Sequence, residues 1–465
     1  MMYTFPNKLR NLSITLMIVG FLGLTYGFLN APSNLEESKS MVSANHGDGH
    51  SESGSGDHGI ISDHQIDSQQ NTEGIVHGLE SSHSDPKTNQ DVSHDLDHDE
   101  HVFHQLSNKP WAAFYVAAFF FFMISLGVLA FYAIQRAAQA GWSPVLYRVM
   151  EGITAYLLPG GIIIIIILSL SGMHLNHLFI WMDPEVVAHD KLIAGKTGYL
   201  NVPFFLLRAV FFLTGWSLYR YFSRKFSLAQ DSAEDISNHK KNFRISAAFL
   251  VFFIVTESVM SWDWIMSIDP HWFSTLFGWY VFASMVVSGV TTIALITIYL
   301  KSKGFLEFVN DSHIHDLGKF MFGISVFWTY LWFSQFMLIW YSNIPEEVTY
   351  FTARLEVSNY RFLFWFSMII NFIVPIIILM SRDAKRHNGR LIFVCIIILI
   401  GHWINSYLLV APGTLGHHGH IGFTEIGMGL GYFGLFIYVV LNSLTKVPLE
   451  VKNHPFLEES KHLHT

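Results

Sequence analysis

The sequence predicts an all-α polytopic membrane protein with ten transmembrane helices. Hydrophobic residues make up 51% of the 465 residues and charged residues only 14%, whereas about 25% charged residues is usual in soluble proteins. Ten apolar runs also have roughly the 20 residues that a helix needs to cross a bilayer. They lie at about 12–30, 111–135, 153–173, 203–222, 245–266, 274–300, 318–341, 361–381, 391–410 and 422–443.

The distribution of Lys and Arg between the loops predicts the orientation. With the N-terminus inside, twenty of the 28 basic residues fall in inner segments and seven in outer segments, and Arg208 lies within the fourth span. Loops rich in Lys and Arg stay in the cytoplasm. We therefore expect a multi-pass protein of a bacterial inner membrane, in contact with membrane lipids and with both termini cytoplasmic.

The spans divide the chain into five segments. Residues 1–30 are expected to form a transmembrane anchor, because the apolar run is longer than the 7–15 residues of a signal peptide and no small-residue cleavage site follows. A cleaved signal peptide is the alternative. Residues 31–110, rich in His and acidic residues, are expected to be a disordered periplasmic loop. Two four-helix bundles follow at 111–270 and 271–412, and residues 413–465 add a last helix and a cytoplasmic tail.

Short matching strings indicate an internal repeat. "FIWMDPE" after the third span matches "LIWYSNIPEE" after the seventh, and "DWIMS" at the end of the fifth span matches "HWINS" in the ninth. Four crossings separate the matching elements, so the two halves should have the same orientation. This predicts two parallel repeats, formed by spans two to five and six to nine, with the first and tenth helices at the periphery. In a superposition, Trp181 should fall on Trp340 and Asp263 near His402.

One ionisable residue lies deep in the fifth span. Glu257 is about eight residues, or roughly 12 Å, from the outer end of that helix. Charges at such depth usually mark a pathway or form a buried pair. Arg208 in the fourth span lies at a comparable depth. Two interpretations follow: a Glu257–Arg208 ion pair that stabilises the bundle, or a proton relay.

The residues after Glu257 extend the relay interpretation toward the outer surface. Asp263 follows on another face of the helix, and Pro270 ends the helix so that Asp269 and His271 reach the rim. In the second half, His402 occupies the place of Asp263. It is a candidate for the relay, and the alternative is that its ring is a hydrogen-bonded structural group. The candidates for a proton path are Glu257, Asp263, Asp269, His271 and His402.

The remaining sequence features bound the function. Solvated charges in the loop after the seventh span are candidates for docking a partner protein; they are Glu346, Glu347, Arg354 and Glu356. A single cysteine, Cys395, excludes an internal disulfide, a c-type haem attachment motif and a thiolate-held iron–sulfur cluster. We expect no catalytic residue, metal or cofactor in this chain, and no nucleic-acid partner.

Long strings of the sequence resemble a known family. "SWDWIMSIDPHWFSTLFGWYVFAS", "GKFMFGISVFWTYLWFSQFMLIWYSNIPEEVTYF" and "MDPEVVAHDKLIAGKTGYLNVPFFLLR" are similar to the ActF-type membrane subunit of alternative complex III, a bacterial quinol:cytochrome c oxidoreductase. The wider relatives are NrfD/PsrC-like subunits, which are built from two four-helix bundles. The resemblance covers about 110–445 and does not extend to the His-rich loop.

The resemblance implies a non-catalytic subunit that acts as scaffold and proton conduit during menaquinol oxidation. It implies an ActC-like sister membrane subunit, and partners that carry iron–sulfur clusters and several haems c, with electrons passing to cytochrome c or a terminal oxidase. Two alternatives stay open. One is a quinone-binding membrane anchor of a polysulfide-reductase-like molybdoenzyme, and the other is a proton-coupled transporter.

Overall fold

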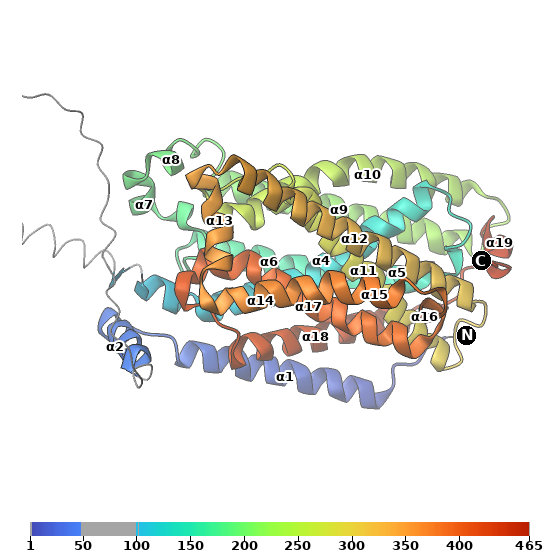
Figure 1. The fold of residues 1–465 in the computed structure, drawn as a ribbon. Helices are drawn as coiled ribbons and strands as arrows, with labels where there is room; N and C mark the ends of the chain where they lie inside the picture. Colours follow the sequence, from blue (N-terminus) through green and yellow to red (C-terminus); the bar gives the residue numbers. More distant parts are fainter. Residues whose placement is uncertain (1, 48–98, 101, 465) are drawn as a thin grey trace, which may run out of the picture. The chain divides into compact units, whose positions relative to one another are not determined.

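The computed structural model describes residues 2–47, 99–100 and 102–464, and every regular element in this part is helical (Figure 1). Ten helical stretches there are long and apolar enough to cross a membrane, and each overlaps one expected span. The predicted fold class is therefore confirmed. The stretches are Asn7–Leu29, Lys109–Ala137, Pro144–Gly172, Val202–Gln230, Ser237–Ile268, Phe277–Ser302, Asp311–Ser342, Ser358–Leu379, Asn388–His418 and Phe423–Leu444.

The chain forms two compact units, Pro32–Ser107 and the remainder. In the smaller unit, residues Leu35–Gly47 form helix α2. Its start is capped: the Asn34 Oδ1 accepts from the Glu37 N–H at 2.9 Å, and the Glu37 Oε2 accepts from the Ser33 N–H at 2.8 Å. The disorder expected for residues 31–110 is therefore wrong for α2. Most of that segment lies outside the described residues.

The larger unit contains the membrane helices, which the structure divides more finely than the sequence did. The first half comprises α4 (Lys109–Ala137), α5 (Tyr147–Ile153), α6 (Leu157–Gly172), α7 (Pro184–His189), α8 (Lys191–Ala194), α9 (Val202–Gln230) and α10 (Ser237–Trp264). The second half comprises α11 (Phe277–Ser302), α12 (Asp311–Ser342), α13 (Pro345–Leu355), α14 (Ser358–Met368), α15 (Val374–Leu379), α16 (Arg382–Arg386) and α17 (Asn388–Leu415). Outside both are α1 (Asn7–Leu29), α18 (Phe423–Leu444) and α19 (Leu457–Lys461).

The two halves have the same order of neighbours. In the first, α4 packs against α6 and α10, and α9 packs against the same two helices. In the second, α11 packs against α12 and α17, and the α14–α15 helix lies between those two. This shared ring agrees with the expected repeat. The environments of the two Trp residues differ: Trp181 is buried and donates to the Ser267 Oγ, whereas Trp340 is exposed.

Helix α4 is the centre of the unit. It contacts α10, α11, α17 and α18, and 94% of its most apolar window is buried. Most residues on all its faces are Ala, Phe, Val, Ile and Leu, as expected for a membrane helix that is surrounded by other helices. The central helix thus joins the two bundles, with direct α10–α11 contact beside it.

Helices α1 and α18 pack through glycine. A Cβ on Gly20 would lie 2.5 Å from the Cα of Gly431, and one on Gly23 would lie 3.1 Å from the Cα of Gly427. Small residues allow such close backbone approach between membrane helices. We call these contacts the glycine seam. It makes α1 a packed helix of the membrane unit, which supports the expected anchor.

We call the end at which α1 begins and α18 ends the basic end, because most Lys and Arg residues lie in its loops. Both termini lie there (Figure 1). The other end, which carries α7, α8 and α13, is called the opposite end.

Candidate functional site

A buried ion pair lies near the opposite end of the first bundle. The Arg208 Nε is 2.6 Å from the Asp263 Oδ2, and the Arg208 Nη2 donates to the Asp263 Oδ1 at 3.1 Å. The Tyr199 hydroxyl donates to the same Oδ1 at 2.9 Å, and the guanidinium lies over the Tyr199 and Phe204 rings. The paired, bidentate geometry satisfies a carboxylate that is almost fully buried. We call Tyr199, Arg208 and Asp263 the Asp263 cluster.

The expected Glu257–Arg208 pair is therefore wrong. Glu257 and Asp263 are six residues apart on α10, which places them about 120° apart around the helix axis. That rotation turns Asp263 toward α9, where Arg208 lies. Glu257 is buried and its Oε1 has no hydrogen-bond partner among the described residues. The carboxyl group is thus free of the ion pair that was expected to lock it.

The two rim candidates lie apart from this cluster. The His271 Nε2 is 2.5 Å from the Asp190 Oδ2, and both side chains are partly exposed. The Ile193 N–H and His271 both hold the pKa of the Asp190 carboxyl below its usual value. Asp269 is half-buried beside this pair. Within the described residues no hydrogen bond links the side chains of Glu257, Asp263, Asp269 and His271 to one another, so the predicted outward chain is not continuous through side chains alone.

A second buried charged cluster lies at the basic end of the same bundle. The Arg148 Nη1 is 2.6 Å from the Glu151 Oε2, and the Arg148 Nη2 is 2.5 Å from the Asp231 Oδ2. The Tyr132 hydroxyl donates to the Glu151 Oε1 at 3.0 Å and accepts from the Arg136 Nη2 at 2.8 Å. We call Tyr132, Arg136, Arg148, Glu151 and Asp231 the Glu151 cluster.

Sequence reasoning missed the Glu151 cluster. The apolar run alone begins the third span at 153, so Arg148 and Glu151 fall outside the predicted span. The helical stretch in fact begins at Pro144 and is interrupted by a 3-10 turn at Thr154–Tyr156. The spacing of Arg148 and Glu151, three residues apart on one helix face, was the available signal.

Polar pairs along the α9–α10 interface lie between the two clusters. Ser223 donates to the Asn242 Oδ1 at 2.7 Å. Tyr219 and Ser246 hydroxyls are 2.8 Å apart. The Trp216 Nε1 donates to the Thr256 Oγ1 at 3.0 Å. We call these pairs the polar ladder; it begins at the Glu151 cluster and reaches the level of Glu257.

The polar ladder is interrupted by an aromatic layer. Ser246 and Thr256 are ten residues apart, about 15 Å along α10, and the buried Phe249 and Phe253 lie between them. Phe249 stacks on Tyr219 at 3.9 Å between ring centroids. A single hydrogen bond spans about 3 Å, so transfer of a proton across this layer needs water molecules or side-chain motion.

The second bundle has neutral polar groups at the corresponding place. His402 is fully buried; its Nδ1 is 2.9 Å from the Ser284 Oγ and its Nε2 has no partner among the described residues. The Tyr280 hydroxyl donates to the Asn405 Oδ1 at 2.5 Å, and Trp328 meets the His402 ring edge to face. His402 therefore makes the hydrogen bond that a structural role predicts, through Nδ1, while its Nε2 makes none among the described residues.

The docking candidates divide between surface and interior. Glu346 and Glu356 are exposed and Glu347 is half-buried. Arg354, expected to be solvated, is instead buried. Its Nε donates to the Leu408 carbonyl at 3.0 Å, and its guanidinium lies 3.4 Å from the centre of the Tyr350 ring. Arg354 therefore fastens α13 to α17 and is corrected from a docking residue to a structural one.

The C-terminal tail covers the Glu151 cluster. The Lys452 N–H donates to the Asp231 Oδ1 at 2.9 Å, and the Asn453 Nδ2 donates to the Asp231 carbonyl at 3.1 Å. The next residue, His454, is buried, with its ring 4.8 Å from that of His239 and 5.5 Å from that of Tyr147. The tail thus closes the basic end of the polar ladder.

We predict that Asp263→Asn destabilises the protein strongly while Glu257→Gln does not. The first change leaves Arg208 buried without a counter-ion, at a cost of about 3–5 kcal/mol. The second removes a carboxyl that makes no ion pair. Melting curves of the purified chain in detergent measure both. Equal melting temperatures for the two variants would show that the Arg208–Asp263 pair contributes nothing to stability.

We also predict that acid releases the tail. Burial, Arg136 and His239 lower the pKa of His454 from 6.5 to about 2. The docked tail therefore holds His454 neutral, and its docking is fully stable above pH 6.5 and weakens as the pH falls below that value. The measurement is the rate of protease cleavage near 452–456 between pH 8 and pH 5. In His454→Phe the remaining charged neighbours, His239, Arg136 and Asp231, stay in place, so a pH dependence equal to that of the wild type would assign the effect to them.

The chain was compared with protein-family models and with curated proteins. No protein-family model matches the chain, and no curated protein matches it. The candidate site therefore rests on its own geometry: two buried ion-pair clusters in the first bundle, joined in part by the polar ladder and flanked by the unpaired Glu257.

Proposed function

We propose that this chain is an integral-membrane subunit of a respiratory quinol:cytochrome c oxidoreductase of the alternative complex III type. In this proposal it is a scaffold that also carries protons coupled to menaquinol oxidation, in a bacterial inner membrane with both termini cytoplasmic. The observation that carries the proposal is the buried series of polar groups in the first bundle, together with the strings that resemble the ActF-type subunit. Intramembrane ionisable residues generally mark proton or ion pathways.

In such a proton path, the Arg208–Asp263 pair and Glu257 have different roles. Arg208 and Asp263 are joined by two hydrogen bonds, so neither side chain can move to another partner without breaking the pair. The Glu257 carboxyl has no such constraint and lies about one helix turn and a half from Asp263 along α10. Glu257 can therefore accept a proton from the Thr256 side and release it toward the opposite end, while Arg208 repels a proton that would pass directly.

Partner subunits supply the rest of the reaction in this proposal. They are the ActC-like sister membrane subunit, the iron–sulfur protein and the multihaem cytochrome c, with a terminal oxidase beyond them. The resemblance to the ActF-type subunit assigns the redox groups to these partners. Glu346 and Glu347 on α13, and Glu356 directly after it, remain the candidate docking residues.

One observation bears on the molybdoenzyme-anchor alternative. A small cavity in the second bundle is lined by aromatic rings and by Gln335 and Asn405, whose amide nitrogens have no hydrogen-bond partners among the described residues. Such donors suit a quinone carbonyl. The cavity volume is only about 20 Å³, however, which is room for one water molecule. A molybdenum cofactor in the purified complex would favour this alternative, and a lone monomer that moves solute would favour the proton-coupled transporter.

The test is the number of protons released per electron in vesicles reconstituted with the purified complex. Glu257→Gln should lower this number while electron transfer continues, because an amide cannot titrate and no electron carrier is assigned to this chain. Glu307→Gln, which removes an exposed carboxyl in the loop between α11 and α12, is the matched control and should leave the number unchanged. An unchanged number in a stably assembled Glu257→Gln complex would remove Glu257 from any proton path.

A further inference from the structure

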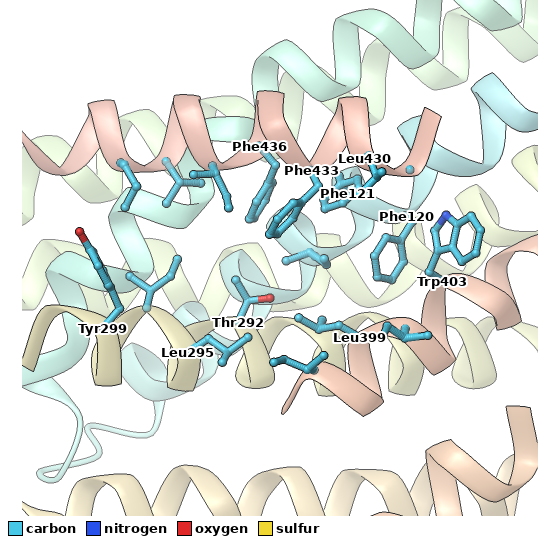
Figure 2. Close-up of a pocket in the computed structure, with 18 of the residues that line it drawn as sticks. Phe120, Phe121, Thr292, Leu295, Tyr299, Leu399, Trp403, Leu430, Phe433 and Phe436 are labelled. Carbon is cyan, nitrogen blue, oxygen red and sulfur yellow. The ribbon is translucent and has the colours of Figure 1, made fainter. Parts of the chain in front are cut away.

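A deep apolar groove lies between four membrane helices of both halves. Its volume is about 580 Å³, and its walls come from α4, α11, α17 and α18 with one residue of α1. Figure 2 shows Tyr299 at one end and Trp403 at the other, with Phe433 and Phe436 between them. Nearly all lining groups are hydrocarbon, so water does not fill this space favourably. The groove therefore needs an apolar occupant.

The chemistry of the walls distinguishes a lipid chain from another helix. Helix α18 has two faces: one is the glycine seam with α1, and the other carries Ile426, Leu430, Phe433, Ile437 and Leu441 into the groove. Helix–helix contacts in membranes favour small residues, as the glycine seam illustrates. The bulky, branched and aromatic wall of the groove is unlike that seam. It suits a thin, flexible chain that fits between side chains.

The basic end of the groove carries positive charge. Leu9 lines the groove, and its neighbours Lys8 and Arg10 are exposed. Lys303 follows Tyr299 by four residues, directly after the end of α11, and is exposed. None of these three cations makes an ion pair in the part of the chain that the structure describes. Three unpaired cations at one mouth of an apolar groove complement a phosphate that carries a hydrocarbon tail.

Aromatic hydroxyls place this mouth at the depth of lipid headgroups. The Tyr299 hydroxyl is 3.2 Å from the hydroxyl of Tyr3, which lies in the segment before α1. Tyr is enriched where the hydrocarbon core meets the headgroup layer. The apolar groove therefore begins at the level where a phospholipid has its glycerol backbone, and the cations lie just beyond it.

We propose that this groove is a binding site for an anionic phospholipid. One acyl chain lies along Phe433 and Phe436, and the phosphate binds Lys8, Arg10 and Lys303. Because the walls belong to both bundles and to α18, the bound chain fills space that no side chain fills and joins the two halves. The site is independent of the proposed function, since it uses none of the residues of the polar ladder.

The experiment counts lipids that stay bound to the full chain, in its complex, by native mass spectrometry. The probes are dioleoyl phosphatidylglycerol and dioleoyl phosphatidylcholine, which share acyl chains and differ in charge. We expect one phosphatidylglycerol to be retained in preference to phosphatidylcholine. Combined Lys8→Gln, Arg10→Gln and Lys303→Gln changes should lower its retention by about fivefold for each charge removed. The matched control is Lys225→Gln, Lys240→Gln and Arg382→Gln, three exposed cations away from the groove.

Filling the groove tests the acyl chain separately. A Cβ on Gly429 would lie at an ordinary contact distance of 3.4 Å from Trp403, so Gly429→Leu should occupy the groove without moving the backbone and should abolish retention. Leu430→Trp, at an already exposed position, serves if that variant fails to fold. Equal retention of both lipids, retention in the filled variants, or recovery of a quinone or a cross-linked partner helix from the groove would overturn the proposal.

Discussion

The absence of hydrogen-bond partners in lipid is the constraint on which the rest of this structure depends. Every backbone polar group must be satisfied within the chain, which restricts the membrane unit to helices. The same constraint applies to side chains. Arg208 and Asp263 occur together, and Arg136 and Arg148 surround Glu151, because a single buried charge would cost several kcal/mol. The pairing of charges within each cluster is therefore needed for the fold to be stable, whether or not the cluster has a function.

This constraint separates the two bundles. The first holds both buried ion-pair clusters and the polar ladder. The second has neutral contacts at comparable places, such as Ser284 with His402 and Tyr280 with Asn405. Its buried cations, Arg354 and Lys385, donate to backbone carbonyls. The two bundles therefore share the same arrangement of helices but differ in their buried polar side chains. The two buried ion-pair clusters lie in the first bundle, and the second packs against α4 and α10.

The sequence was sufficient for the features that follow from long, regular patterns. Ten spans, their order and the likeness of the two halves depend on apolar length and on strings at matching places. The sequence did not predict which buried side chains pair with each other. Arg208 has two acidic residues within reach on α10, and only the rotation between Glu257 and Asp263 decides between them. The same limit explains Arg354, whose burial depends on Tyr350 and the Leu408 carbonyl, and Arg148, whose helix extends beyond the apolar run that marked it.

The unpaired state of Glu257 is informative because its neighbours show that pairing was available. A cation lies on the adjacent helix, and the chain uses it for Asp263, one and a half turns away. A purely structural carboxyl at the Glu257 position would gain by sharing that cation, or could be replaced by an apolar residue at little cost. Keeping a buried carboxyl without a counter-ion costs stability. Such a cost is expected where the protonated and ionised states are both used, and this distinguishes Glu257 from every charged member of the two clusters.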